Sequence, residues 1–276
     1  MMTNKKKVAV LVAAHCAPKI LKMTLGTWLS EYDQSYDVDV YVSVHKNYHH
    51  YHPGLQEIMD MEPFIKVVPV DEMNWGKYPE GTIESVFRYS EAHMRNISRL
   101  MEVANEYSSD ITHVAVIDHD LVFKQDFIDW ATGKDCDLVC SLFEDRWSNK
   151  MIKTGIGIEI MFAPKPSAWH LVMGRRMIDM VLKSPGIILP GVKDGKCFDS
   201  MSFMYHEAVE HGMNVCLYPE NYMKKMVEHL WMMSFNYGQS QSPDDYRKKL
   251  AEREAEYDKM FPKGIGTLLE KLKRRV

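Results

Sequence analysis

The sequence lacks a long hydrophobic segment, because no apolar run in its 276 residues approaches the roughly 20 residues that a membrane-spanning helix needs. It begins MMTNKKKVAVLVAAH, a basic start followed by an apolar stretch, which is also how a secretion signal begins. That stretch is only about eight residues long, and its pattern favours a β-strand over the hydrophobic region of a signal peptide. We therefore expect a cytoplasmic protein without stable membrane insertion.

Cysteine is scarce, with five residues, and no two of them form a CxxC pair. Their number is odd, and their spacing matches no zinc-binding pattern. We therefore expect neither a disulfide framework nor a structural zinc site. The five are Cys16, Cys136, Cys140, Cys197 and Cys216.

An excess of positive charge is also missing, because 34 Lys and Arg stand against 38 Asp and Glu, a net charge of −4. This balance excludes a protein that binds nucleic acid with its whole surface. The charge is unevenly distributed: residues 244–276 hold 10 basic and 7 acidic side chains, a net +3, which leaves −7 for residues 1–243. Contact with an anionic partner must therefore be local.

Several common catalytic motifs are absent, namely GxGxxG, GxxxxGK[ST], GxSxG and HExxH. Their absence argues against Rossmann dehydrogenases, P-loop kinases, serine hydrolases and zincins. A double arginine, Arg175-Arg176, follows Gly174 near a predicted helix. Guanidinium groups can bind phosphate through two hydrogen bonds, but a solvated helix face is the simpler interpretation.

The first half of the chain alternates strand and helix signals. Residues 37–45, DVDVYVSVH, alternate apolar and polar side chains as a strand does, and residues 20–32 gather apolar side chains on one helix face. Because helix-sized segments separate the strands, the pattern indicates βαβ units and a mostly parallel sheet. The other elements expected here are strands at 8–14, 64–70, 112–117 and 137–142 and a long helix at 83–107.

The second half is less regular. The expected elements are strands at 155–163 and 215–218, helices at 168–182 and 198–211, and a loop rich in Gly and Pro at 185–195. No internal repeat and no long linker interrupts the chain. We therefore predict an α/β protein with a single domain over residues 1–243 and a charged helical carboxy-terminal extension over residues 244–276.

The most informative local pattern is THVAVIDHDLVF, residues 112–123, in which an apolar strand ends in Asp118-His119-Asp120. In open parallel sheets, ligands bind beyond the carboxyl ends of the strands. Alternate residues of an extended segment point the same way, so both carboxylates can bind one divalent cation such as Mg²⁺ or Mn²⁺. A solvated strand end remains the alternative interpretation.

The order and spacing of several segments resemble those of nucleotide-sugar glycosyltransferases with the GT-A fold, of the broad type that contains the family-two-like enzymes. The resemblance covers roughly residues 7–235. It rests on VAVLVAAHCAP at 8–18, VVPVDEMNWGKY at 67–78, HMRN at 93–96 and DHD at 118–120. It implies a GT-A-like, Rossmann-type sheet flanked by helices, with DHD at the position of the metal-binding DxD motif.

The resemblance also implies which residues bind the donor. Asp120 would be the direct metal ligand, and Asp118 would contact the sugar or ribose or share the metal. Trp75 can stack on a base or sugar, although a packed core tryptophan explains it equally well. The implied donor-binding residues are Ala14, His15, Asp71, Trp75, Arg95 and Asp118.

Two later segments complete the implied site. FDSMSFMYHEAVEHGMNVCLYP, residues 198–219, resembles the acceptor-side segment, with His206-Glu207 in place of the usual Glu-Asp. Glu207 would be the catalytic base, and Asp199 is a second candidate. KMVEHLWMMSF, residues 225–235, supplies His229 as a further metal ligand. A helix-surface carboxylate and a structural histidine are the alternative interpretations.

These implications describe a metal-dependent transferase that moves a sugar from a nucleoside diphosphate sugar to an acceptor hydroxyl. A UDP-sugar is the favoured donor, and inversion is the expected stereochemistry. Mn²⁺ or Mg²⁺ would be the cofactor. The acceptor would be a saccharide, a protein or a 5-hydroxymethylpyrimidine of phage DNA, in the host cytoplasm if the source is a virus. A nucleotidyltransferase and a non-catalytic nucleotide-binding module are the alternatives.

Overall fold

The computed structural model describes residues 5–13, 18–45, 65–70, 83–142, 151–153, 159–219 and 221–229, together with residues 244, 248, 251, 252, 255 and 259. The expected helical extension over residues 244–276 therefore lies mostly outside the described residues. No helix in the described part of the chain is long and apolar enough to cross a membrane.

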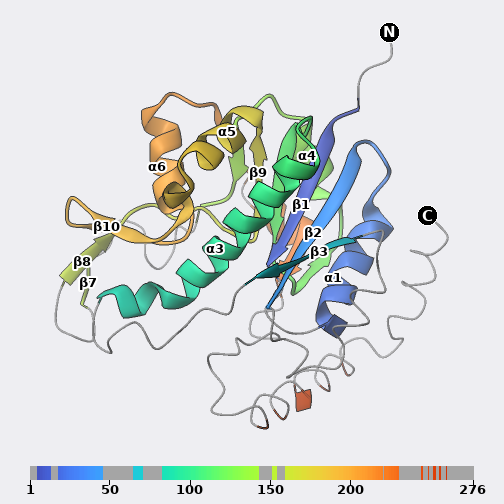
Figure 1. Cartoon of the computed structure of the whole chain (residues 1–276), viewed down its shortest axis with the longest axis horizontal. Coiled ribbons are helices and arrows are strands. Elements are labelled where there is room, and N and C mark those ends of the chain that lie inside the picture. Colours follow the sequence, from blue (N-terminus) through green and yellow to red (C-terminus); the bar gives the residue numbers. More distant parts are fainter. Residues whose placement is uncertain are drawn as a thin grey trace.

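A central seven-stranded sheet organises the molecule, with strand order β12-β6-β9-β4-β1-β2-β3 (Figure 1). Strand β9 pairs antiparallel with β4 and β6, and the other neighbouring strands pair in parallel. The predicted α/β class with a mostly parallel sheet is confirmed. The strands are β1 (Lys7–Ala13), β2 (Asp37–His45), β3 (Ile65–Val70), β4 (His113–Ile117), β6 (Leu138–Cys140), β9 (His170–Gly174) and β12 (Val215–Leu217).

Helices cover both faces of this sheet, which explains why β1 is apolar along its whole length. Its alternate residues Val8, Val10 and Val12 pack in the core on the side of α1 (Pro18–Glu31) and α4 (Phe127–Thr132). Its other residues pack on the opposite side. That side is covered by α3 (Ile83–Tyr107), α5 (Arg175–Lys183) and α6 (Ser202–Glu210), and α3 crosses the sheet in Figure 1.

Two smaller sheets flank the central one. The first has the order β10-β11-β8-β7, and the second pairs β5 with β13. Short helices α7 and η3 connect these parts. The bounds are β5 (Leu121–Phe123), β7 (Met151–Lys153), β8 (Glu159–Phe162), η3 (Pro185–Ile188), β10 (Gly191–Lys193), β11 (Lys196–Phe198), α7 (Tyr222–Met226) and β13 (Val227–His229).

The strands and helices predicted for the first half are present, and the bounds predicted for β2 and α3 match the structure. The helix predicted at 168–182 is wrong in its first part, because His170–Gly174 forms β9 between β4 and β6. This short apolar run is buried throughout, so its sequence cannot separate a core strand from a buried helix turn. The loop predicted at 185–195 contains η3 and β10.

The expectation of no disulfide is also wrong, because Cys136 and Cys216 form one. They are separated by 80 residues in the sequence, so no short spacing marks them as a pair. Cys216 lies on β12, which pairs in parallel with β6, and Cys136 lies in the segment that leads into β6; their Cα atoms are 6.1 Å apart. Cys140 and Cys197 are free and buried. The disulfide thus joins the edge strand β12 to the body of the sheet.

Candidate functional site

The sheet has a topological switch point beside β1. From β1 the chain adds β2 and β3 on one side, and β4 then lies on the other side of β1. Such a point opens a crevice beyond the carboxyl ends of the two strands, where ligands of open α/β sheets bind. Asp118 follows the last residue of β4 directly and therefore lies at this edge.

The small sheet β5–β13 brings His229 to the same edge. Asp120 directly precedes β5, and antiparallel pairing of β5 with β13 places His229 opposite Leu121. Asp118, Asp120 and His229 are thus gathered from the end of one strand, the start of a second and the end of a third.

A buried threonine of α1 fixes the turn that carries the two aspartates. The Thr24 hydroxyl donates a hydrogen bond to the carbonyl of His119 at 2.7 Å and accepts one from the amide of Leu121 at 3.0 Å. Thr24 is fully buried, and these two bonds satisfy backbone groups that have no water available. Helix α1 therefore helps to set the conformation of residues 118–121.

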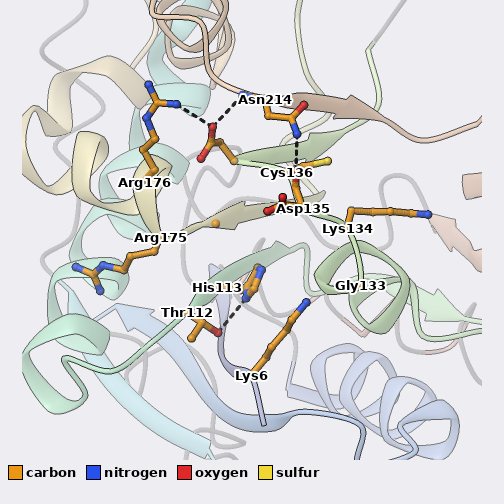
Figure 2. A pocket seen from close by; sticks show the side chains of 12 residues that line it. Lys6, Thr112, His113, Gly133, Lys134, Asp135, Cys136, Arg175, Arg176 and Asn214 are labelled. Atoms are coloured by element: carbon orange, nitrogen blue, oxygen red, sulfur yellow. Dashed lines mark hydrogen bonds and ion pairs between the residues drawn. The ribbon is translucent and has the colours of Figure 1, made fainter. Parts of the chain in front are cut away.

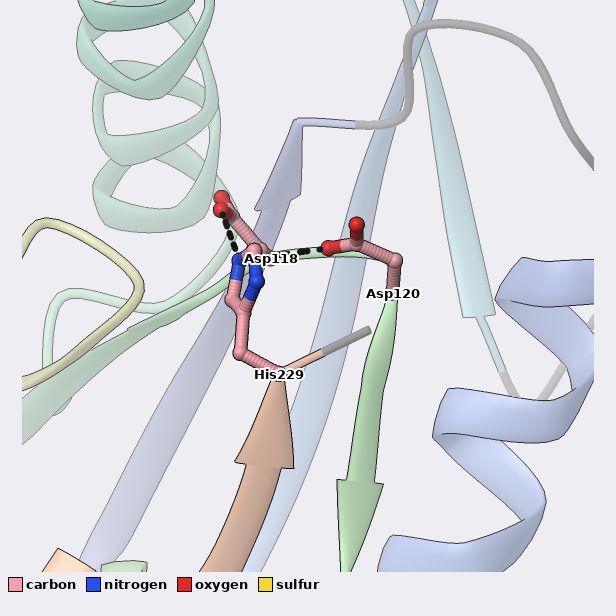
Figure 3. Close-up of side chains that lie close together, drawn as sticks. All are labelled: Asp118, Asp120 and His229. Atoms are coloured by element: carbon pink, nitrogen blue, oxygen red, sulfur yellow. Dashed lines mark hydrogen bonds and ion pairs between the residues drawn. The ribbon is translucent and has the colours of Figure 1, made fainter. Parts of the chain in front are cut away.

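The three side chains converge, as Figure 3 shows. His229 Nε2 lies 3.2 Å from Asp118 Oδ2 and 3.4 Å from Asp120 Oδ1. One ligand atom from each residue lies within 4.8 Å of those of the other two. The His229 and Asp120 side chains are only 7% and 5% exposed, so the group is shielded from bulk water.

Two carboxylates and one imidazole suit a divalent cation. Carboxylate oxygens bind Mg²⁺ and Mn²⁺, and a neutral imidazole complements them on Mn²⁺. Burying two carboxylates this close together is costly without a compensating positive charge. The residues present therefore fit the metal ion that the DxD-like pattern predicts.

The electrostatics of Asp118 favour its ionised form. Burial alone would raise the pKa of this carboxyl, but the hydrogen bond with His229 and the neighbouring histidines hold it well below its usual range. Asp118 is therefore a carboxylate at neutral pH, which is the form that binds a cation.

Two further side chains, His93 and Trp169, contact this group. His93 on α3 places Nε2 3.5 Å from Asp118 Oδ1, and burial lowers the pKa of His93, so its imidazole is neutral near pH 7. The indole of Trp169 packs against the ring of His229, with ring centroids 4.7 Å apart. His93 belongs to the HMRN segment, but only the folded helix reveals that this histidine faces Asp118.

Asp199 lies in a second polar group, which is partly buried. Its Oδ2 accepts a hydrogen bond from Lys165 Nζ at 2.5 Å, and its Oδ1 accepts one from the amide of Ser200 at 2.7 Å. Burial would raise the pKa of Asp199, but the charge and hydrogen bond of Lys165 outweigh that effect and lower it. Lys165 also contributes to lowering the pKa of His93, which links this group electrostatically to the Asp118 side of the crevice.

Glu207 is placed differently, on the last turns of α6. Its two carboxylate oxygens pair with Lys193 at 3.6 Å and with His211 at 3.3 Å. No contact joins Glu207 to Asp118, Asp120 or His229 among the described residues. Its assignment as the catalytic base stays a prediction.

The remaining predicted donor residues do not join the group in the described part of the structure. Arg95 is exposed and forms an ion pair with Glu91 on its own helix. Two residues span about 200° on a helix, so Arg95 points away from the face that presents His93 to Asp118. The other four, Ala14, His15, Asp71 and Trp75, lie outside the described residues.

Comparison with known proteins identifies no family. No family model matches the sequence, and no curated protein sequence matches it. The chain is similar to solved structures of the galactosyltransferase LgtC, one in complex with donor and acceptor sugar analogs (10% identity, TM-score 0.42) and one of an active-site mutant (9% identity, TM-score 0.41). Each similarity covers 89% of this chain and 95% of the other. Similarity at this level assigns no function.

Proposed function

We propose that this protein is a metal-dependent glycosyltransferase that moves a sugar from a nucleoside diphosphate sugar to an acceptor hydroxyl. The observation that carries the proposal is the convergence of Asp118, Asp120 and His229 at the carboxyl edge of the sheet, beside the switch point. The sequence resemblance to GT-A enzymes supports the same conclusion, because it assigns a metal to these three positions.

The three residues would hold Mn²⁺ or Mg²⁺ through two carboxylates and the imidazole of His229. A divalent cation at this position neutralises the negative charge of a diphosphate leaving group. Thr24 keeps the aspartates in place through its bonds to the turn, and Trp169 restrains the ring of His229. These contacts preorganise the ligands, which reduces the reorganisation that metal binding requires.

We favour Asp199 over Glu207 as the carboxylate that contacts a hydroxyl of the sugar or the acceptor. The two side chains are about equally exposed, 19% for Asp199 and 18% for Glu207. However, Lys165, the ion-pair partner of Asp199, also acts electrostatically on His93, which lies beside Asp118. The ion pair with Lys165 keeps Asp199 ionised at neutral pH, so it can accept a hydrogen bond from a sugar or acceptor hydroxyl. A lowered pKa also makes it a weak base, which favours orienting a hydroxyl over removing its proton completely.

The first experiment measures thermal stabilisation by nucleotide sugars with and without Mn²⁺. A donor that binds the folded state raises the apparent melting temperature by mass action. We expect stabilisation by a nucleotide sugar that requires Mn²⁺ and disappears in Asp120→Asn. The matched control is Asp194→Asn, an exposed aspartate with φ of 52°, where asparagine is well tolerated. Stabilisation that persists in Asp120→Asn would contradict the metal-site proposal.

Product analysis separates the alternatives. A glycosyltransferase releases a nucleoside diphosphate from a nucleotide sugar, whereas a nucleotidyltransferase releases pyrophosphate from a triphosphate. A nucleotide-binding module releases neither, although it binds the donor. Saccharides, peptides and 5-hydroxymethylpyrimidine DNA are then compared as acceptors with the donor that binds most tightly. Asp199→Asn is expected to reduce transfer far more than donor binding, and Glu207→Gln tests the other carboxylate in the same assay.

A further inference from the structure

A cavity lies at the edge of the central sheet where the amino ends of β1 and β4 meet (Figure 2). Its volume is about 530 Å³, within the range of small-molecule sites. Lys6 and His113 line it from the amino ends of β1 and β4, while Arg175 and Arg176 line it from the start of α5. Because Asp118 follows the far end of β4, about 16 Å of strand separates it from His113. The cavity is therefore distinct from the proposed metal site.

The lining of the cavity is positively charged, in contrast to the chain as a whole. The lining includes four cations and two carboxylates. The cations are Lys6, Lys134, Arg175 and Arg176, and the carboxylates are Asp135 and Asp137. The balance of 4 − 2 gives +2, while the whole protein carries −4. A concave surface with a net positive charge attracts anions.

Two of these cations have no anionic partner among the residues that the structure describes. Arg175 pairs with Asp179. Arg176 pairs at 3.3 Å with Asp137, which is the second carboxylate of the lining. Lys6 and Lys134 form no ion pair within the described part of the chain. Lys6 donates to a backbone carbonyl, and the ammonium of Lys134 lies 4.5 Å from the centre of the Trp130 ring. Each ammonium has three donors, so both retain hydrogen-bonding capacity.

The positive charge of Lys6 affects the pKa of the neighbouring His113. In Figure 2, Lys6 reaches into the cavity beside His113, whose Nδ1 contacts the hydroxyl of Thr112 at 2.9 Å. Burial and, to a smaller extent, the charge of Lys6 lower the pKa of His113 to about 4. His113 is therefore neutral near pH 7, and it reports any anion that offsets the charge of Lys6.

We propose that this cavity binds a small phosphate-bearing anion through Lys6 and Lys134, with Arg176 at its rim. Neither ammonium group has an ion-pair partner among the described residues, and Lys binds a phosphate or diphosphate as a point charge. The cavity is a partly open hollow of about 530 Å³, a volume that suits a compact ligand. The carboxylate of Asp135 lines the same space and can accept a hydrogen bond from a hydroxyl of the ligand.

The test is a titration with inorganic phosphate and pyrophosphate in EDTA, at ionic strength kept constant with sodium chloride. EDTA prevents binding through a metal at Asp120, so the result is independent of the proposed transferase function. Binding is followed by thermal stabilisation and by NMR of the His113 ring. We expect saturable binding and a rise in the pKa of His113 at saturation.

Variants locate the binding. The double variant Lys6→Gln/Lys134→Gln is expected to bind phosphate at least about tenfold more weakly, in line with the loss of two charge-assisted contacts. The matched control Lys183→Gln removes a lysine from the last turn of α5, which does not line the cavity. Asp120→Asn should bind phosphate like the wild-type protein.

Two outcomes would overturn the proposal. One is the absence of saturable phosphate binding, or equal binding by the double variant and the wild-type protein. The other is binding of a DNA duplex that depends on Lys6 and Lys134 but is not displaced by phosphate or pyrophosphate, which would assign this surface to a nucleic-acid backbone instead.

Discussion

His229 Nε2 lies 3.2 Å from Asp118 Oδ2 although 111 residues separate them in the sequence. Asp118 is placed by the end of a core strand, and His229 by a three-residue strand on a separate small sheet. The proposed site therefore depends on how the two sheets are held relative to each other. Variants of the metal ligands and variants of the residues that position them test these two contributions separately.

Removing His229 is expected to weaken Mn²⁺ binding without unfolding the protein. His229→Ala deletes one of three converging ligands, so we expect the Mn²⁺ affinity to fall by about 10–100-fold or more. Isothermal titration calorimetry measures the affinity, and His206→Gln is the control because His206 pairs with Glu210 on α6. Unchanged Mn²⁺ affinity in His229→Ala would mean that this histidine is structural.

Thr24 tests whether α1 preorganises the aspartates. In Thr24→Val the carbonyl of His119 and the amide of Leu121 lose their buried partner, which we expect to cost about 1–3 kcal/mol in the free energy of unfolding. Mn²⁺ affinity should fall as well, because the turn between the ligands is no longer fixed.

Thr24→Ser supplies the matched control for that variant. It keeps the hydroxyl and removes only a methyl group, so metal affinity should return close to the wild-type value in the same calorimetric assay. Equal metal affinity in Thr24→Val and the wild-type protein would show that the turn needs no support from α1.

Asp126 predicts a pH-dependent stability. Burial raises its pKa to about 6, although the carboxylate caps α4 and accepts a hydrogen bond from Tyr36 at 2.7 Å. The folded state therefore binds a proton on Asp126 more tightly than the unfolded state does. This protonation stabilises the folded state fully below the ordinary pKa of about 4, and the stabilisation is lost as the pH rises through about 6.

Asp126→Asn removes this titration while its side-chain oxygen can still cap the helix. Relative to the wild-type protein, the variant should gain stability between pH 4 and pH 7, by up to about 3 kcal/mol. Urea unfolding of both proteins across this range measures the difference. A difference that does not change with pH would contradict the shifted pKa of Asp126.

The disulfide predicts a stability that depends on reducing agent. Cys136 and Cys216 close a loop across 80 residues of sequence, and bridging such a loop typically stabilises a domain by about 2–5 kcal/mol. Dithiothreitol should lower the unfolding midpoint of the wild-type protein by a corresponding amount. The double variant Cys136→Ser/Cys216→Ser should already have the lower midpoint and should not respond to dithiothreitol. A response in the double variant would point to a different cysteine pair.

Much of the fold could be read from the sequence because its long elements have strong local periodicity. The alternation of residues 37–45 and the apolar face of residues 83–107 predicted β2 and α3 with their observed bounds. The short strand β9 was not predicted, because a run of five residues that is buried throughout carries no period that distinguishes a strand from a helix.

The sequence by itself determined that an apolar strand ends in Asp118 and Asp120 within a mostly parallel α/β sheet, because these features depend on residues close together in the chain. The resemblance also implied that His229 joins them. Only the tertiary structure decided that His93 meets Asp118, that Cys136 pairs with Cys216, and that Lys6 lines a cationic cavity with Arg176. Each of these contacts joins distant segments through strand pairing or helix packing, and no local pattern of side chains encodes such a distance.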